Sequence, residues 1–231
     1  GMPEDVEYQN CEKENAAKYV NSPETAFYQK SKIIYGLHKS KTEIVRENSC
    51  ILVEGYMDYL MSWQAGVKNV VASSGTALTG QHLDILKRLT GILLTAFDMD
   101  EAGQSATKRS IDLALLKGFE VKVIKLEGNA KDPAEVVQKS PDSWKQMIAK
   151  GVPIMNFYFD KVMSQYNPEK IEYKKLIAQK LLPEIKKLSS PIEQAHWISE
   201  LSLKLKIKES VLEEELKKMP TTGLSDDLMS I

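Results

Sequence analysis

The sequence has few of the residues that bind zinc or form covalent cross-links. Its 231 residues include two cysteines, Cys11 and Cys50, and three histidines, His38, His82 and His196. Two cysteines exclude a four-cysteine zinc ribbon within this chain and argue against a disulfide-rich secreted scaffold. The histidines are scattered and lack the spacing of zinc ligands. A metal site in this chain would therefore depend on carboxylate oxygens.

Long apolar runs and an excess of one charge are also missing. No apolar run approaches the roughly 20 residues of a membrane span, and 31 basic against 32 acidic residues give a formal net charge of −1. A nucleic-acid contact would therefore need a local cluster of Lys or Arg. With 42% apolar and 27% charged residues, the composition is typical of a globular protein. We expect a cytoplasmic protein without a membrane partner.

The middle of the chain alternates short apolar runs with amphipathic stretches. The runs are CILVEG, VKNVVASSG, GILLTAFDMD and FEVKVIKL, which begin at residues 50, 67, 91 and 119. We predict four buried strands joined by helices, which form a parallel sheet covered on both faces. Thr79 is a candidate N-cap, and Gly66 and Gly118 are candidate helix stops. The predicted fold class is α/β, a parallel sheet flanked by helices.

Strand signals disappear after about residue 134. From there to residue 218 the sequence predicts successive amphipathic helices, with breaks near Pro153, Pro168, Pro183 and Pro191. We therefore expect an all-helical part after the sheet.

Acidic residues follow the predicted strands at the end where open parallel sheets bind ligands. These acids are Glu54, Asp58, Asp98, Asp100 and Asp132. Carboxylates gathered at one edge repel one another, and a divalent cation removes that cost. Mg²⁺ prefers hard oxygen ligands and leaves room for substrate phosphates, which suits phosphoryl or nucleotidyl transfer.

Several of these acids also fit a structural role. The stretch DPAE at 132–135 is a helix-capping signature, and Asp100 can cap the helix that follows it. Asp58 suits the positive end of a helix without binding metal. Glu54 and Asp98 fit a capping role poorly. The pattern alone therefore supports a shared metal site and a set of helix caps about equally.

The ordered motifs resemble those of bacterial DnaG-type DNA primases. Counterparts of the family's TOPRIM domain, a metal-binding α/β fold, are VEGYMD at 53–58, ASSGTALT at 72–79, AFDMDEAGQSA at 96–106 and KDPAE at 131–135. Residues 18–37 resemble the stretch that precedes TOPRIM in primases and separates them from other TOPRIM proteins. Each motif alone is weak, and the series is specific. One departure is Ala134, where the family often has Asp.

The resemblance implies four segments. Residues 1–47 would be the end of the basic N-terminal subdomain of the primase core, 48–150 the TOPRIM domain, 151–220 the helical subdomain and 221–231 a linker-like tail. The family's zinc-ribbon and helicase-binding domains would lie outside this chain. We therefore expect part of a larger primase, which alone makes few or no primers.

The resemblance also implies roles for single residues. Glu54 would bind metal or serve as general acid or base. Metal ligands, direct or through water, would be Asp58, Asp98, Asp100 and Asp132. Side chains that face template or nucleotide would be Lys18, Asn21, Lys30 and Arg109.

The expected activity is that of a DNA primase, which makes short RNA primers on single-stranded DNA for replication by metal-dependent nucleotidyl transfer. The cofactor would be Mg²⁺, with Mn²⁺ as a substitute. The partners would be single-stranded DNA, ribonucleoside triphosphates and, through the domain absent here, the replicative helicase of the bacterial replisome. Two alternatives are another TOPRIM enzyme, either a topoisomerase or a nuclease, and a non-catalytic TOPRIM module that binds DNA or a partner.

Overall fold

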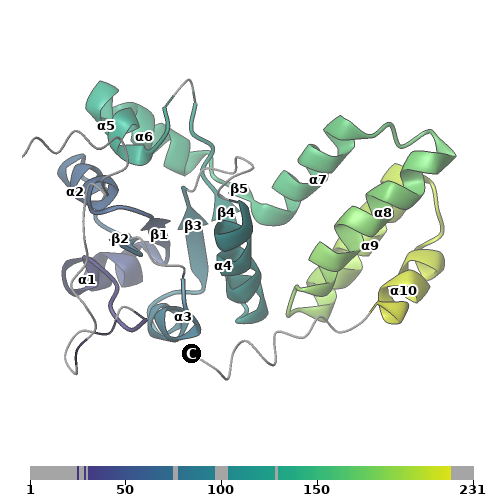
Figure 1. Cartoon of the computed structure of the whole chain (residues 1–231), viewed down its shortest axis with the longest axis horizontal. Helices are drawn as coiled ribbons and strands as arrows, with labels where there is room; N and C mark the ends of the chain where they lie inside the picture. Colours follow the sequence, from purple (N-terminus) through teal and green to yellow (C-terminus); the bar gives the residue numbers. More distant parts are fainter. Residues whose placement is uncertain are drawn as a thin grey trace, which may run out of the picture.

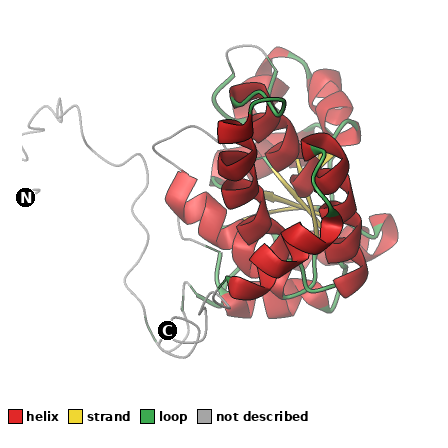
Figure 2. Ribbon diagram, turned by 90° about the vertical axis from the view of Figure 1, so that its right-hand side faces the viewer, coloured by secondary structure: helices red, strands yellow, loops and turns green. Residues whose placement is uncertain are grey.

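The computed structural model describes residues 25, 29, 31–74, 78–96, 104–127 and 130–219. Within these ranges a five-stranded sheet lies among helices, and a further group of helices continues beyond one side of the sheet (Figure 1). A view turned by a quarter shows the strands enclosed by helices (Figure 2). None of the helices in the described ranges is long and apolar enough to cross a membrane.

The sheet has the strand order β2–β1–β3–β4–β5. Four strands are parallel, as predicted: β1 (Cys50–Val53), β2 (Val70–Ala72), β3 (Ile92–Thr95) and β4 (Glu120–Val123). The fifth strand, β5 (Val152–Pro153), pairs antiparallel with β4. The prediction that no strand follows residue 134 is therefore wrong. Two residues are too few to show the alternating pattern by which a strand is recognised in a sequence.

Helices cover both faces of the sheet because neighbouring strand residues point to opposite sides. In β1, Cys50 and Leu52 belong to one buried cluster, and Ile51 and Val53 belong to the other. The first cluster includes residues of α1 (Leu37–Glu47), α3 (Gly80–Lys87) and α4 (Gln104–Leu116). The second includes residues of α2 (Tyr56–Gln64), α5 (Pro133–Lys139) and α6 (Pro141–Ala149).

The predicted helix signals near the sheet are confirmed. The Thr79 hydroxyl accepts a hydrogen bond from the His82 N–H at 3.1 Å, which caps α3. Gly66 (φ 90°) and Gly118 (φ 74°) follow α2 and α4 in the left-handed conformation, which glycine adopts without steric cost.

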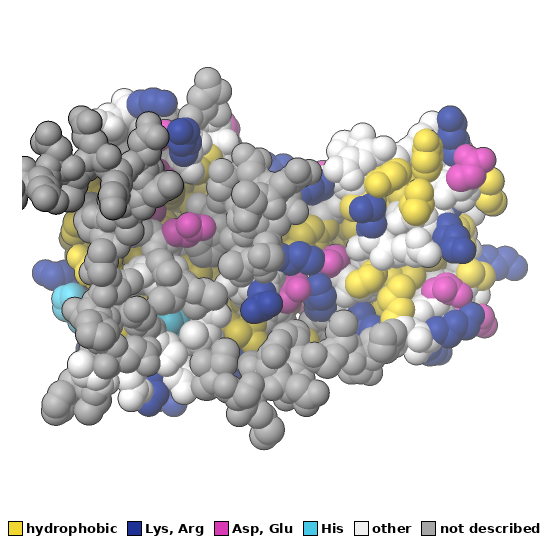
Figure 3. All heavy atoms as spheres, in the orientation of Figure 1, with side chains coloured by type: hydrophobic (Ala, Val, Ile, Leu, Met, Phe, Trp, Pro, Cys, Tyr) yellow, Lys and Arg dark blue, Asp and Glu magenta, His cyan; other side chains and the backbone are white. Residues whose placement is uncertain are grey.

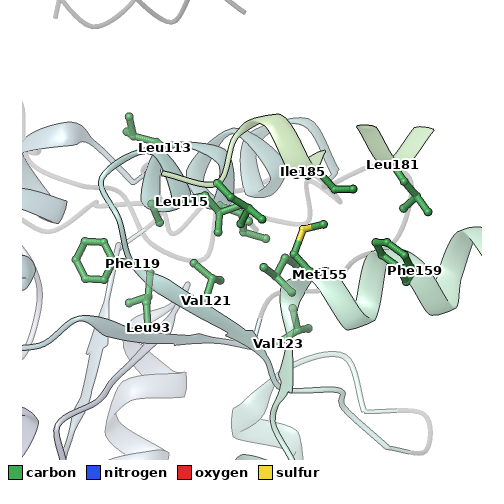
Figure 4. Close-up of a cluster of buried hydrophobic side chains, with 14 of the residues drawn as sticks. Leu93, Leu113, Leu115, Phe119, Val121, Val123, Met155, Phe159, Leu181 and Ile185 are labelled. Carbon is green, nitrogen blue, oxygen red and sulfur yellow. The ribbon is translucent and has the colours of Figure 1, made fainter. Parts of the chain in front are cut away.

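The predicted all-helical part consists of α7 (Ile154–Gln165), α8 (Ile171–Lys186), α9 (Pro191–Leu205) and α10 (Glu209–Lys218). These helices share one apolar core with the sheet. Figure 4 shows Val121 and Val123 of β4 close to side chains of α7 and α8, among them Met155 and Ile185. The helical part is therefore anchored to the sheet by burial of apolar surface.

One predicted helix break is wrong. Breaks occur near Pro153, Pro168 and Pro191, whereas Pro183 lies inside α8, which continues to Lys186. Proline removes a backbone donor from a helix and favours a break. Here the residues after it are held by packing, because Ile185 is fully buried and belongs to the shared core.

Candidate active site at the carboxyl edge of the sheet

Three of the five predicted acids lie at the carboxyl edge of the parallel strands. Glu54 directly follows β1, Asp58 lies in the first turn of α2, and Asp132 precedes α5. Asp98 and Asp100 lie outside the described residues. The same holds for three of the residues predicted to face template or nucleotide, Lys18, Asn21 and Lys30.

Asp58 is buried, with an exposed fraction of 7%. One carboxylate oxygen, Oδ2, accepts a hydrogen bond from the Gly55 N–H at 3.0 Å, and Oδ1 accepts one from the Ala134 N–H at 3.2 Å. Burial raises the pKa of Asp58, the two N–H groups lower it in part, and the charge of Asp132 raises it further. The carboxylate thus joins the first turns of α2 and α5, so both of its oxygens already have partners.

Asp132 caps α5, as the capping signature predicted. Its Oδ1 accepts a hydrogen bond from the Glu135 N–H at 2.8 Å, and Pro133 occupies the first helical position. The Glu135 side chain in turn accepts a bond from the Lys131 N–H at 3.0 Å. Among the described residues no hydrogen bond is made by the second oxygen of Asp132, Oδ2. Capping and metal binding are therefore compatible at this residue.

Glu54 is exposed, and its backbone is fixed by the neighbouring strand exit. The Glu54 carbonyl accepts a hydrogen bond from the Ser74 N–H at 2.9 Å, and the Val53 carbonyl accepts one from the Ser73 N–H at 3.1 Å. Ser74 adopts a left-handed conformation with φ 58°. These bonds extend the pairing of β1 and β2 beyond the strands and hold the Glu54 main chain at the edge.

A metal ion needs more ligands than these acids supply. In the ranges that the structure describes, no three side chains of His, Cys, Asp or Glu gather closely enough to hold a metal ion. Glu54 and Asp132 offer the hard oxygen atoms that Mg²⁺ prefers. The donor chemistry of Glu54 and Asp132 is therefore compatible with a carboxylate-held cation, and a contribution of Asp98 and Asp100 to such a site stays a prediction.

The two neighbouring basic residues of α4, Lys108 and Arg109, differ in their contacts. Arg109 is exposed and forms no ion pair among the described residues. Lys108 Nζ lies 2.6 Å from Glu184 Oε1 of α8 and 5.0 Å from the centre of the Tyr158 ring. Arg109 is therefore the member of the pair that presents its charge to solvent.

Sequence reasoning missed the side chains that hold the loop after β2. The buried Ser110 hydroxyl of α4 accepts a hydrogen bond from the Leu78 N–H at 3.2 Å. The Thr79 hydroxyl, besides capping α3, donates to the Ser31 carbonyl at 2.7 Å. The cap has a local sequence signal, but the other two bonds join residues more than 30 positions apart and have none.

Three family models match successive parts of this chain. A Toprim-like model matches residues 51–137, and a model of the N-terminal domain of the DNA primase catalytic core matches 9–41. The third, a model of the DnaB-helicase binding domain of primase, matches 155–210. The chain belongs to the DnaG-type DNA primase family. This primase sequence is 32% identical over 200 residues to a DNA primase of Halalkalibacterium halodurans, covering 86% of this chain and 33% of the relative.

Two further similar proteins are also DNA primases, and each match again covers most of this chain. A DNA primase of Campylobacter jejuni is 35% identical over 214 residues, which cover 90% of this chain and 34% of the relative. A crystal structure of a DNA primase domain from Pseudomonas aeruginosa matches with a TM-score of 0.77 and 27% identity, over 89% of this chain and 65% of that one. This primase chain spans about a third of the length of the curated relatives it matches.

The comparisons describe the C-terminal helices in two ways. The helicase-binding model covers 155–210, which sequence analysis assigned to the helical subdomain of the core. A structure of the DnaG catalytic core matches 87% of this chain with a TM-score of 0.73 and 28% identity, over 66% of that chain. The assignment of these helices to the helical subdomain of the core therefore stays a prediction.

Proposed function

We propose that this primase chain holds the nucleotidyl-transfer site for the synthesis of short RNA primers on single-stranded DNA. The observation that best supports this function is the grouping of Glu54, Asp58 and Asp132 at one edge of a parallel sheet in a member of the primase family. The site is built from carboxylates and lies where open parallel sheets bind their ligands.

In this proposal Asp98, Asp100 and Asp132 hold Mg²⁺, for which Mn²⁺ can substitute. Metal dependence is general in the Toprim and primase families. The bound cation supplies positive charge for the phosphates of the incoming nucleotide. Glu54, exposed at the end of β1, binds metal or accepts the proton of the attacking hydroxyl. Asp58 is a positioning residue, because its buried carboxylate joins the segments that carry Glu54 and Asp132.

The proposed substrates are single-stranded DNA and ribonucleoside triphosphates. A DnaG primase catalytic domain whose structure was solved bound to single-stranded DNA matches 86% of this chain, with a TM-score of 0.74 and 28% identity, over 64% of that chain. Arg109, which forms no ion pair among the described residues, would face template or nucleotide together with Lys18, Asn21 and Lys30. The proposed protein partner is the replicative helicase, and the match of 155–210 to a helicase-binding model supports it.

Ribonucleotide incorporation tests this function. The chain is supplied with a DNA template, ribonucleoside triphosphates and Mg²⁺ or Mn²⁺, and a short RNA is annealed so that initiation is not required. We expect extension that chelation abolishes and that the double variant Asp98→Ala/Asp100→Ala lowers by about 100-fold or more, because several kcal/mol of charge stabilisation are lost. Asp142→Asn, at an exposed acid of α6, is the matched control and should extend normally.

Two readouts separate the alternatives. Cleavage of labelled DNA in the same reactions, without extension, would indicate a nuclease or topoisomerase. Binding of Mn²⁺, followed by electron paramagnetic resonance, tests the metal site without turnover. A chain that binds DNA but neither binds Mn²⁺ nor extends the RNA would be a non-catalytic module, and the proposed function would be wrong.

A further inference from the structure

Phe157 of α7 lies close to two lysines, one of which follows the carboxyl end of β4. The Nζ atom of Lys125 lies 5.4 Å from the centre of the Phe157 ring, and that of Lys161 lies 6.0 Å from it. Lys161 is one helical turn beyond Phe157 and on the same side of α7. These three residues are called the Phe157 platform below.

The platform is connected to the carboxyl edge of the sheet through Lys125. Lys125 comes two residues after the end of β4, so it extends from the carboxyl edge of the parallel strands, and the same segment leads on to Asp132. The first turn of α7, which carries Phe157, packs against β4 and β5. Figure 1 shows α7 leaving the sheet at this point. Lys125 therefore places one positive charge of the platform on the edge of the sheet that carries the acids.

Among the described residues, no acid is paired with either lysine of the platform. Neither forms an ion pair within the part of the chain that the structure describes, whereas Lys122 and Lys150 nearby pair with Glu120 at 3.1 Å and with Glu127 at 3.4 Å. Asp160 lies on the exposed side of α7 but pairs with neither lysine. The space-filling view shows basic, acidic and hydrophobic side chains intermingled over the right-hand part of the molecule, where α7 and α8 lie (Figure 3).

The ring itself is held firmly. Phe157 is half-buried, packs against the core shared by the sheet and helices, and contacts the Tyr158 ring edge-on at 6.1 Å. A cation–π contact at an exposed site is weak, so either lysine can leave the ring for a stronger anion. The platform thus offers an aromatic surface held by packing and two positive charges beside it.

We propose that the Phe157 platform binds single-stranded nucleic acid, with a base stacked on the ring and two backbone phosphates contacted by Lys125 and Lys161. Aromatic rings combined with positive charge are the usual means of binding single strands without sequence preference. An acidic peptide would occupy the lysines but leave the ring unused, so it fits the platform less well. This inference rests on the proposed function, and it adds a contact by which the helical part guides the strand at the acid edge.

The chain also contains a matched control surface. Lys170 lies 5.8 Å from the Tyr173 ring, and Lys180 lies 5.7 Å from the Tyr166 ring. These pairs have the same chemistry but belong to α8 and the turn before it, where the chain has left the sheet (Figure 1). Substitutions of these lysines and tyrosines test whether nucleic-acid binding depends on the position of the platform as well as on its chemistry.

Binding is measured by fluorescence anisotropy of a labelled oligodeoxythymidylate, without nucleotides and with a chelator, over a series of salt concentrations. In Lys125→Gln/Lys161→Gln the slope of log K against log salt should fall by about 1.4, because each single-strand phosphate contributes about 0.7. Phe157→Leu keeps apolar packing and should weaken binding by about 5- to 150-fold. Phe157→Tyr keeps the ring and should bind like the wild type.

The controls Lys170→Gln/Lys180→Gln and Tyr173→Leu should leave both quantities unchanged. An equal fall of the slope in both double lysine variants would show that binding depends on general surface charge, and it would overturn the proposal. Unchanged binding in Phe157→Leu would overturn it too. Displacement of the DNA by polyglutamate at matched charge would favour an acidic peptide instead. Because no turnover is scored, failure of nucleotide transfer and failure of the platform are distinguishable.

Discussion

At the scale of single residues, Asp58 connects two segments that are far apart in the sequence. Its carboxylate accepts N–H groups from Gly55 and Ala134, and it is almost completely buried. A buried carboxylate without these donors would be strongly unfavourable. The two bonds therefore fix the separation between the segment after β1 and the segment before α5, on which Glu54 and Asp132 lie.

We expect Asp58→Asn to lower the free energy of unfolding by about 2 kcal/mol, because the amide accepts one N–H but turns its own NH₂ towards the other. Urea unfolding measures this loss. If Asp58 positions the two segments, the folded variant should also bind Mn²⁺ more weakly than the wild type. Asp142→Asn controls for the loss of a negative charge and should change neither quantity. A destabilised variant with unaltered Mn²⁺ affinity would limit Asp58 to the fold.

At the scale of elements, the start of α1 depends on a residue that cannot carry a side chain. Gly36 adopts φ 80°, and a Cβ atom placed there would overlap the ring of Tyr59 in α2. The preceding residue, Tyr35, exchanges backbone hydrogen bonds with Ala72 of β2 at 3.0 and 3.1 Å. The close approach of Gly36 to Tyr59 thus joins α1, α2 and the edge of the sheet.

Gly36→Ala should be more destabilising than Gly66→Ala, and the difference isolates the clash. Both glycines have positive φ, so alanine costs about 1–2 kcal/mol at either position. At Gly66 the added Cβ meets only Lys145, at 4.0 Å, whereas at Gly36 it enters the Tyr59 ring. Overpacking of this kind adds about 1–3 kcal/mol. Equal midpoints of urea unfolding for the two variants would contradict this explanation.

The elements also show which parts of the structure can be read from the sequence. The four parallel strands and the caps at Thr79 and Asp132 were predictable, because an apolar run or a cap involves residues within a few positions. The continuation of α8 past Pro183 was not, because it depends on burial against elements that are distant in sequence. The same reason hides the role of Asp58, whose second partner, Ala134, lies 76 positions away.

The candidate site was predictable to a similar degree. The rule that parallel strands present their carboxyl ends together correctly placed Glu54, Asp58 and Asp132 on one edge. It did not indicate that backbone N–H groups occupy both oxygens of Asp58. Whether Asp98 and Asp100 complete a metal site stays a prediction, because they lie outside the described residues.

At the scale of the whole molecule, a charged network joins the sheet domain to the helical part. Lys187, at the C-terminal end of α8, lies 2.8 Å from Asp112 of α4 and 2.9 Å from Glu184 of α8. Glu184 also forms an ion pair with Lys108 of α4 at 2.6 Å. The side chains of Lys187, Asp112 and Glu184 are only 11–15% exposed. The packing of the helical part on the sheet could not be predicted from the sequence. In the structure, this charged network contributes to it by joining the end of α8 to α4.

The charges of this network favour the ionised lysine. Burial alone would lower the pKa of Lys187, but the hydrogen bond to Asp112 and the charge of Glu184 outweigh it, so the pKa lies above its ordinary value. The pKa of Asp112 also lies above its ordinary value, in this case because burial disfavours the charged carboxylate. The hydrogen bond and charge of Lys187 and the charge of Lys108 oppose this rise in the pKa of Asp112.

Lys187→Met should lower the free energy of unfolding by about 3 kcal/mol at neutral pH, because it leaves two buried carboxylates without their shared partner. The raised pKa makes this contribution fully present below about pH 10.4, the ordinary pKa of lysine, and it is lost as the pH rises through the folded value. The gap between wild type and variant in urea unfolding should therefore close in alkaline solution. Lys145→Met, which removes an exposed pair with Asp142, should cost little at any pH. A gap for Lys187→Met that stayed constant with pH would assign the effect to packing of the lysine stem rather than to its charge.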